Sequence, residues 1–132
     1  MSDYRKLQVW QKAHAMALAT VGIATKIRGA QFASFRNQIT RAAMSVPTNI
    51  VEGRDQQSEA GFARYLRIAI GSASELEYHL LAARDIEAIS RSEHHALSAQ
   101  VVEVRMTLHG LVRRLDRSSP AKSASLRDRR EP

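Results

Sequence analysis

The chain has 132 residues, the size of one domain that buries about two thirds of its unfolded surface. Only 5% of the residues are aromatic, and the many Ala, Leu, Arg, Glu and Gln residues favour helices over a β-sandwich or barrel. There is no cysteine, which excludes disulfides and thiolate metal sites and is in keeping with a reducing compartment.

The chain is strongly basic, with a formal net charge of +7 and a sequence pI of about 10.5. Such a charge on a small domain indicates an acidic partner, and nucleic acid is the usual one. A soluble protein with many exposed Arg side chains carries the same charge without any such partner. Both interpretations stay open on composition alone.

No segment predicts a membrane anchor or a secretion signal. The most apolar run, residues 13–25, is shorter than the roughly 20 residues that cross a bilayer. Asp3, Trp10 and Lys12 precede it within a periodic pattern, which argues against a signal peptide. We therefore expect a cytoplasmic protein without a membrane partner.

The first helix is predicted by apolar residues that recur every three or four positions from Leu7 to Ala24. Gly29 is expected to end this helix. Lys26 and Arg28 would then lie in its last turn, where cations oppose the helix dipole.

The second helix contains the stretch RAAMSVPTNIVEG, residues 41–53, which places a proline inside a helical pattern. Pro47 has no N–H group, and its ring collides with the carbonyl of Ala43. The apolar residues keep one face across the proline: Ile39, Ala43, Val46 and Ile50. This continuity predicts one kinked helix, with Ser34 as N-cap, Glu52 near its end and Gly53 at C′.

Polar residues form a stripe beside that apolar face, at steps of four, four and three residues: Arg41, Ser45, Asn49 and Glu52. In one interpretation the stripe is solvated, or satisfies the carbonyl freed by the proline and ties the helix to a neighbour. In the other it is a site for a ligand or a partner.

Two further helices complete the pattern, the third with Asp55 or Ser58 as its N-cap and the fourth after residues 89–95. The third is predicted to bury Phe62, Leu66, Ala69, Ala73, Leu76, Leu80 and Ala83, and the fourth Leu97, Val101, Val104, Leu108, Leu111 and Leu115. Short connections between helices with this spacing predict an all-α, up-down antiparallel four-helix bundle over residues 1–117.

The third helix carries small residues at its centre, where Gly71 and Ser72 are followed by Ala73 and Ser74. A glycine inside a helix costs about 0.5–1 kcal/mol relative to alanine. The simplest use of such a patch is close approach of another helix, from the same subunit or from a neighbouring one.

Three stretches in this order and spacing resemble the four-helix-bundle proteins of the 23S rRNA intervening-sequence family, also called S23-type. They are LQVWQKA (7–13), RAAMSVPTNIVEG (41–53) and GSASELEYHL (71–80). The resemblance covers about residues 4–115. The family pattern maps onto Arg41, Ser45, Pro47, Asn49, Glu52, Gly53, Gly71, Ser72 and Glu75. The chain departs from it at Ile27–Arg28, where the family often has a Phe-Pro pair.

The resemblance implies an up-down bundle that assembles into a ring of five subunits, with no established enzymatic activity. Some relatives are encoded inside insertions in bacterial rRNA genes. Distant basic relatives are accessory proteins of diversity-generating retroelements, which bind nucleic acid and a reverse transcriptase. These properties are expectations for this chain.

The positive charge suggests where nucleic acid could bind. Arg105, His109, Arg113 and Arg117 step by four along the fourth helix, and we expect Arg105, Arg113 and Arg117 to contact phosphates of RNA, DNA or a nucleoprotein. Glu103 and Asp116 interrupt the surroundings of this stripe. The alternative is a structural or protein-adaptor ring whose charge only aids solubility.

No motif predicts catalysis, a cofactor, a metal or a small-molecule substrate. The chain has no Glu-x-x-His pair of the kind that holds metals in bundles. Glu75 and His79 are four residues apart, and the adjacent His94 and His95 point in different directions on a helix. Residues 118–132 hold four cations and two anions without apolar periodicity, so we expect a disordered basic tail.

Overall fold

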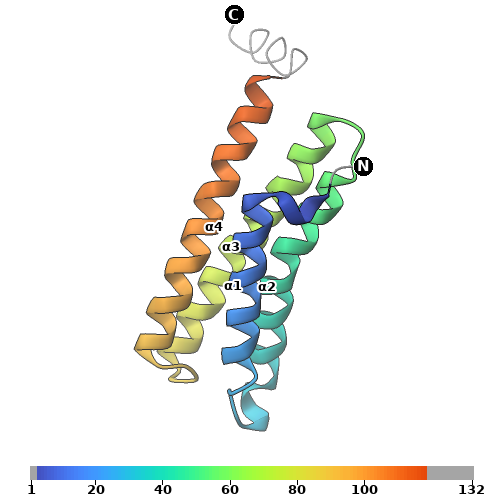
Figure 1. Ribbon diagram of the computed structural model, residues 1–132. Helices are drawn as coiled ribbons and strands as arrows, with labels where there is room; N and C mark the ends of the chain where they lie inside the picture. Colours follow the sequence, from blue (N-terminus) through green and yellow to red (C-terminus); the bar gives the residue numbers. More distant parts are fainter. Residues whose placement is uncertain (1–2, 119–132) are drawn as a thin grey trace, which may run out of the picture.

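The computed structural model describes residues 3–118, and these form an antiparallel bundle of four long α-helices (Figure 1). The helices are α1 (Gln8–Ala24), α2 (Ala33–Arg54), α3 (Glu59–Asp85) and α4 (Arg91–Arg117). Short 3-10 helices precede α1 (Tyr4–Lys6) and α2 (Ala30–Phe32). The all-α bundle is confirmed. Of the expected tail only Ser118 is described, as the C-cap of α4, and residues 119–132 lie outside the described part.

The helices are arranged in a square, in which α2 packs against α1 and α3, and α4 packs against α3 and α1. Each helix runs antiparallel to the next in the chain, as the short connections predicted (Figure 1). No helix among the described residues is long and apolar enough to cross a membrane.

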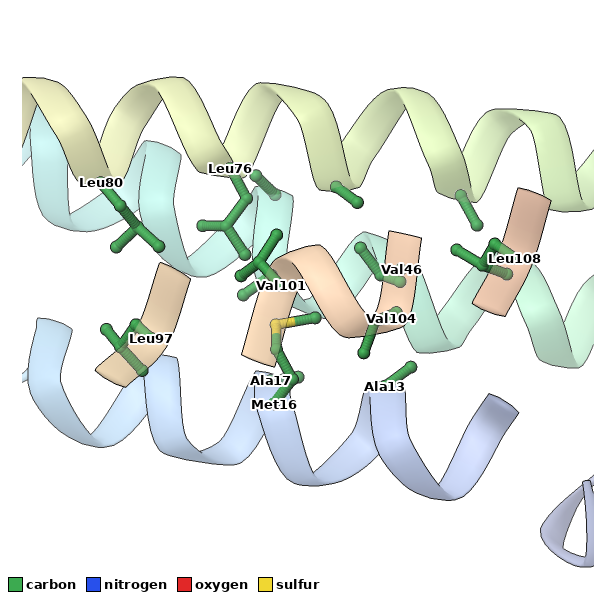
Figure 2. Close-up of a cluster of buried hydrophobic side chains, with 14 of the residues drawn as sticks. Ala13, Met16, Ala17, Val46, Leu76, Leu80, Leu97, Val101, Val104 and Leu108 are labelled. Atoms are coloured by element: carbon green, nitrogen blue, oxygen red, sulfur yellow. The ribbon is translucent and has the colours of Figure 1, made fainter. Parts of the chain in front are cut away.

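The core is a continuous column of aliphatic side chains along the bundle axis (Figure 2). All seven predicted core residues of α3 are buried, and in α4 the buried residues are Leu97, Val101, Val104, Leu108 and Val112. Leu111 and Leu115 are only half-buried. They lie beyond the level at which α1 begins, so α1 does not cover them.

α1 ends at Ala24, earlier than the predicted end at Gly29. The chain turns out of the helix, and Ile27 packs into the core with 5% of its surface exposed. The Arg36 side chain donates hydrogen bonds to the carbonyls of Ile27 (2.9 Å) and Gly29 (3.0 Å), while Gly29 has the positive φ of 106° that glycine tolerates. Burial of Ile27, with these carbonyls satisfied by Arg36, therefore replaces the expected last turn.

α2 is one helix that continues through Pro47, as the unbroken apolar phase predicted. Two polar side chains after the proline donate to carbonyls of the preceding turn. Thr48 Oγ1 lies 2.8 Å from the carbonyl oxygen of Met44, and Asn49 Nδ2 lies 2.8 Å from that of Ser45. Neither bond is to the carbonyl of Ala43, the one that the proline leaves without its usual donor.

Both predicted ends of α2 were wrong. Ser34 is not the N-cap, because it lies inside the first turn and accepts from Gln38 Nε2 at 3.0 Å. Gly53 is not a C′ residue, because α2 continues to Arg54. A β-carbon at Gly53 would lie 2.9 Å from Tyr65 Cβ and 3.0 Å from Phe62 Cδ1. This glycine therefore allows close packing of α2 against α3.

The N-termini of α3 and α4 are both capped by serine. Ser58 Oγ accepts from the Gly61 amide at 3.0 Å, which settles the choice between Asp55 and Ser58. α4 begins at Arg91, before the predicted start, since Ser90 and Glu93 form a reciprocal capping box with bonds of 3.0 and 2.8 Å. The Ser-x-x-Glu spacing was visible in the sequence and its significance was missed.

α4 extends past the start of α1 (Figure 1), while its last turns stay tied to α3, where Asp116 accepts from Arg67 at 2.6 Å and the Ser118 hydroxyl donates to Glu59 at 2.7 Å. The Lys12–Glu103 ion pair of 2.8 Å sets the level of α1 against α4. Residues about one turn beyond Glu103 are therefore level with the first turn of α1, and the rest of α4 rises above it. This projection leaves the C-terminal turns of α4 open to solvent on the α1 side.

Candidate nucleic-acid interface

The C-terminal end of α4 carries three exposed arginines, which we call the basic end: Arg113, Arg114 and Arg117. Within residues 3–118 none of these three side chains forms an ion pair. Arg114 and Arg117 also lie in the last turn of α4, where cations stabilise the helix dipole.

The two acids that interrupt this region in the sequence are already engaged by other cations. Asp116 accepts from Arg67 of α3 at 2.6 Å, and Glu103 accepts from Lys12 of α1 at 2.8 Å. Neither carboxylate is paired with an arginine of the basic end. The pairs also tie α4 to its two neighbours in the bundle, so the positive surface rests on a fixed scaffold.

Arg105 does not belong to the same free surface. Its Nε lies 2.6 Å from Glu77 Oε2 of α3, and both side chains are about one quarter exposed (25% and 27%). A step of four residues advances 40° past a full helical turn, so a stripe of such steps drifts around α4. Arg105 therefore faces α3, while Arg113 and Arg117 face solvent. Phosphate contact by Arg113 and Arg117 stays a prediction, and Arg114, which the four-residue steps passed over, joins them.

A second polar feature is a pocket of about 330 Å³ between α2 and α3, which we call the α2–α3 pocket. It is lined by Gln38, Arg41, Ala42, Ser45, Ser72 and Glu75. Four of these residues, Arg41, Ser45, Ser72 and Glu75, belong to the motif that carried the family resemblance. The structure thus brings together residues that lie some 30 positions apart in the sequence.

The pocket floor is a hydrogen-bonded link between the two helices. Ser45 Oγ and Ser72 Oγ lie 2.8 Å apart, and Asn49 Nδ2 donates to Ser45 Oγ at 3.0 Å. Ser45 therefore ties α2 to α3, as one interpretation of the polar stripe expected, whereas Asn49 donates to Ser45 and not to the carbonyl freed by the proline. Arg41 and Glu52 are exposed and make no side-chain hydrogen bond within the described chain.

The small-residue patch of α3 contacts α2 within the subunit through only part of its residues. Ser72 lies 2.8 Å from Ser45 of α2, Oγ to Oγ, and Ala73 is buried in the core. Gly71 itself is exposed, and a β-carbon added there would meet nothing within 4 Å. A contact of Gly71 with a neighbouring subunit stays a prediction.

The histidines do not assemble into a metal site. Among the described residues there is no group of three or more His, Asp or Glu side chains that could hold a metal ion. His79 Nε2 lies 3.3 Å from Glu75 Oε1. His94 and His95 lie in the second turn of α4, where His95 is exposed and His94 half-buried.

Comparison with known proteins agrees with this architecture. The family model described as 23S rRNA-intervening sequence protein matches residues 5–110. The chain is also similar to a protein of unknown function from the S23 ribosomal protein family of Bacteroides thetaiotaomicron, with a crystal structure at 1.70 Å resolution. The two share 28% sequence identity over 79% of this chain and 97% of the other, with a TM-score of 0.74. No curated protein matches the chain. The match of the family model over most of the bundle establishes that the chain belongs to the 23S rRNA-intervening sequence protein family.

Proposed function

We propose that this chain is a non-catalytic cytoplasmic protein that assembles into a homo-oligomeric ring and binds nucleic acid through the basic end. A ring of five subunits follows from the family resemblance described above. The observation that carries the binding role is the cluster Arg113, Arg114 and Arg117, unpaired among the described residues while the adjacent Asp116 is held by Arg67.

An arrangement of this kind favours contact with phosphates over direct contact with bases. Guanidinium groups form bidentate hydrogen bonds with phosphate oxygens, and several of them along one helix end follow a nucleic-acid backbone without regard to sequence. Assembly into a ring multiplies the positive charge that attracts phosphates. The net charge of +7, less the net +2 of residues 118–132, leaves +5 on each bundle. A ring of five bundles therefore carries about +25 before counterions bind.

A protein-adaptor ring is the second candidate, and a specific observation favours it. Four of the seven large hydrophobic side chains that are exposed in the described chain belong to α3 or follow it directly: Ile68, Tyr78, Leu81 and Ile86. Exposed apolar side chains on one helix are typical of a surface that contacts protein. In that case the positive charge would only keep the assembly soluble.

The test is a filter-binding titration of duplex and structured RNA at about 50 mM salt. The variant Arg113→Gln, Arg114→Gln, Arg117→Gln is compared with a control that removes the same charge elsewhere, Lys26→Gln, Arg28→Gln, Arg91→Gln. The control residues are exposed and lie at the other end of the bundle, after α1 and at the start of α4. We expect the first variant to bind at least about tenfold more weakly than wild type, and the control to lose much less.

The outcomes separate the candidates. If the wild-type protein retains no RNA or DNA at this salt concentration, nucleic-acid binding is refuted and the adaptor ring takes its place. If both variants lose affinity equally, binding follows net charge alone and the basic end is not the interface. Exposed charges contribute little to stability, so the melting temperatures of both variants should stay close to that of wild type.

A further inference from the structure

The α2–α3 pocket places a cation and an anion opposite each other without pairing them. The hydrogen bond between Ser45 and Ser72 fixes the level of α2 against antiparallel α3. Arg41 precedes Ser45 by about one helical turn and Glu75 follows Ser72 by about one turn, so both reach the same level. Both line the pocket, yet within residues 3–118 no ion pair joins them. One rim of the pocket therefore offers the guanidinium donors of Arg41, and the opposite rim offers the carboxylate of Glu75.

The floor of the pocket supplies one more donor. Ser45 and Ser72 have two hydroxyl hydrogens, and their mutual bond of 2.8 Å uses one of them. Ser45 Oγ also accepts a hydrogen bond from Asn49 Nδ2, which occupies a lone pair of that oxygen and not its hydrogen. Whichever serine donates in the mutual bond, one hydroxyl hydrogen stays free for a ligand.

The carboxylate of Glu75 also has a partner on its own helix. His79 Nε2 lies 3.3 Å from Glu75 Oε1, about one turn along α3. Each carboxylate oxygen accepts about two hydrogen bonds, so Glu75 can still accept from a ligand in the pocket.

We infer that the α2–α3 pocket binds one unpaired guanine base of an RNA strand, an inference that rests on the nucleic-acid binding proposed above. Guanine offers two adjacent N–H donors on N1 and N2 to the Glu75 carboxylate, and the O6 and N7 acceptors to the Arg41 guanidinium. The pocket volume of about 330 Å³ falls at the lower end of the range for small-ligand sites.

The other bases match this arrangement less well. Uracil presents a single N–H group to a carboxylate, and cytosine and adenine present one amino group beside a ring acceptor that repels the second carboxylate oxygen. A base in a duplex has its pairing edge occupied and cannot reach Glu75. The pocket therefore distinguishes unpaired from paired RNA, whereas phosphate contact at the basic end does not.

The test uses the full chain and the four nucleoside 5′-monophosphates, titrated by calorimetry or NMR at about 150 mM salt, where contact with phosphate alone is weak. We expect guanosine monophosphate to bind saturably and at least about fivefold more tightly than the other three. Arg41→Gln and Glu75→Gln should each weaken it by about 5- to 100-fold. The matched controls are Arg91→Gln and Glu87→Gln, both exposed and outside the pocket, and they should leave binding unchanged.

The outcomes test guanine binding in the α2–α3 pocket separately from nucleic-acid binding at the basic end. Equal binding of the four monophosphates, or unchanged binding by the two pocket variants, would overturn the guanine pocket even if long RNA still binds at the basic end. Guanosine binding that is lost only in the pocket variants would support the pocket even if Arg113, Arg114 and Arg117 proved dispensable. A pocket variant that alters the oligomeric state in light scattering would place the pocket at a contact between copies, which would also refute it.

Discussion

Two glycines show how differently one residue type acts in this bundle. Gly53 is buried where α2 meets α3, and an added β-carbon would press against Tyr65 Cβ at 2.9 Å. Gly71 lies at the centre of α3 with open space around it. The first permits close packing within the subunit, and the second has no use in the described subunit.

Substitution of these glycines by alanine should therefore have opposite effects. We expect Gly53→Ala to lower the free energy of unfolding by about 1–3 kcal/mol, because Tyr65 Cβ is next to the backbone and cannot move aside cheaply. Gly71→Ala should raise it by about 0.5–1 kcal/mol through helix propensity. Urea denaturation of both variants measures the difference. Equal effects would contradict the packing assigned to Gly53.

The buried residues were largely predictable, because apolar spacing reports one helix face. The contacts of polar residues were not. The sequence contains Arg105 in a regular four-residue series, but its pairing with Glu77 depends on which helix is its neighbour and at what level. The link between Ser45 and Ser72 likewise joins residues 27 positions apart. Such contacts follow from register, which periodicity does not specify.

At the scale of the helix, α2 continues through an internal proline and keeps one buried face on both sides of it. Thr48 and Asn49 each donate to a carbonyl four residues earlier, but neither bonds to the carbonyl of Ala43 that the proline leaves without its usual donor. The element and its continuity were predicted from the apolar phase. Its ends were not, because Arg36 and Gly53 act through contacts with the α1–α2 loop and with α3.

Replacement of this proline by alanine should leave the bundle folded and moderately more stable. Pro47→Ala restores an N–H group to the helix and gains about 3 kcal/mol of propensity, from which lost burial of the ring and a freer unfolded chain subtract about 2 kcal/mol. The expected net gain is about 1 kcal/mol in urea denaturation. A loss of helical circular dichroism would show that α2 depends on the proline.

The ion pair between α3 and α4 should contribute more than the one between α1 and α4. Glu77 and Arg105 are both about one quarter exposed, whereas Glu103 of the Lys12–Glu103 pair is 61% exposed. Double-mutant cycles with Gln should give a coupling energy of about 1 kcal/mol for the first pair and under about 0.5 kcal/mol for the second. The reverse order would contradict the burial on which this ranking depends.

At the scale of the whole molecule, the bundle leaves large hydrophobic and small residues of α3 exposed. Ile68, Tyr78 and Gly71 all lie on the solvent side of that helix. Self-association would cover such a surface, and the family resemblance implies five subunits. Neither the number of subunits nor the contact face is encoded in the periodicity that predicts the fold.

Sedimentation equilibrium at micromolar concentration tests the assembly. Five chains of 14.7 kDa should give a particle of about 74 kDa. A species of 14.7 kDa would refute the ring. The summed positive charge of five bundles, on which tight binding to RNA depends, would then be absent. A dimer would leave self-association in place and refute the five-membered ring.

Contact between the basic end and nucleic-acid phosphates is tested most directly by the salt dependence of binding. The observed association constant for RNA is measured between about 50 and 200 mM salt for the wild type and for the Arg113, Arg114, Arg117 triple Gln variant. Counterion release predicts a steep linear fall of log K with log salt for the wild type, and a slope shallower by up to about three phosphate contacts for the variant. Parallel slopes for the two proteins, or a wild-type affinity that does not change with salt, would contradict phosphate contact by the three arginines of the basic end.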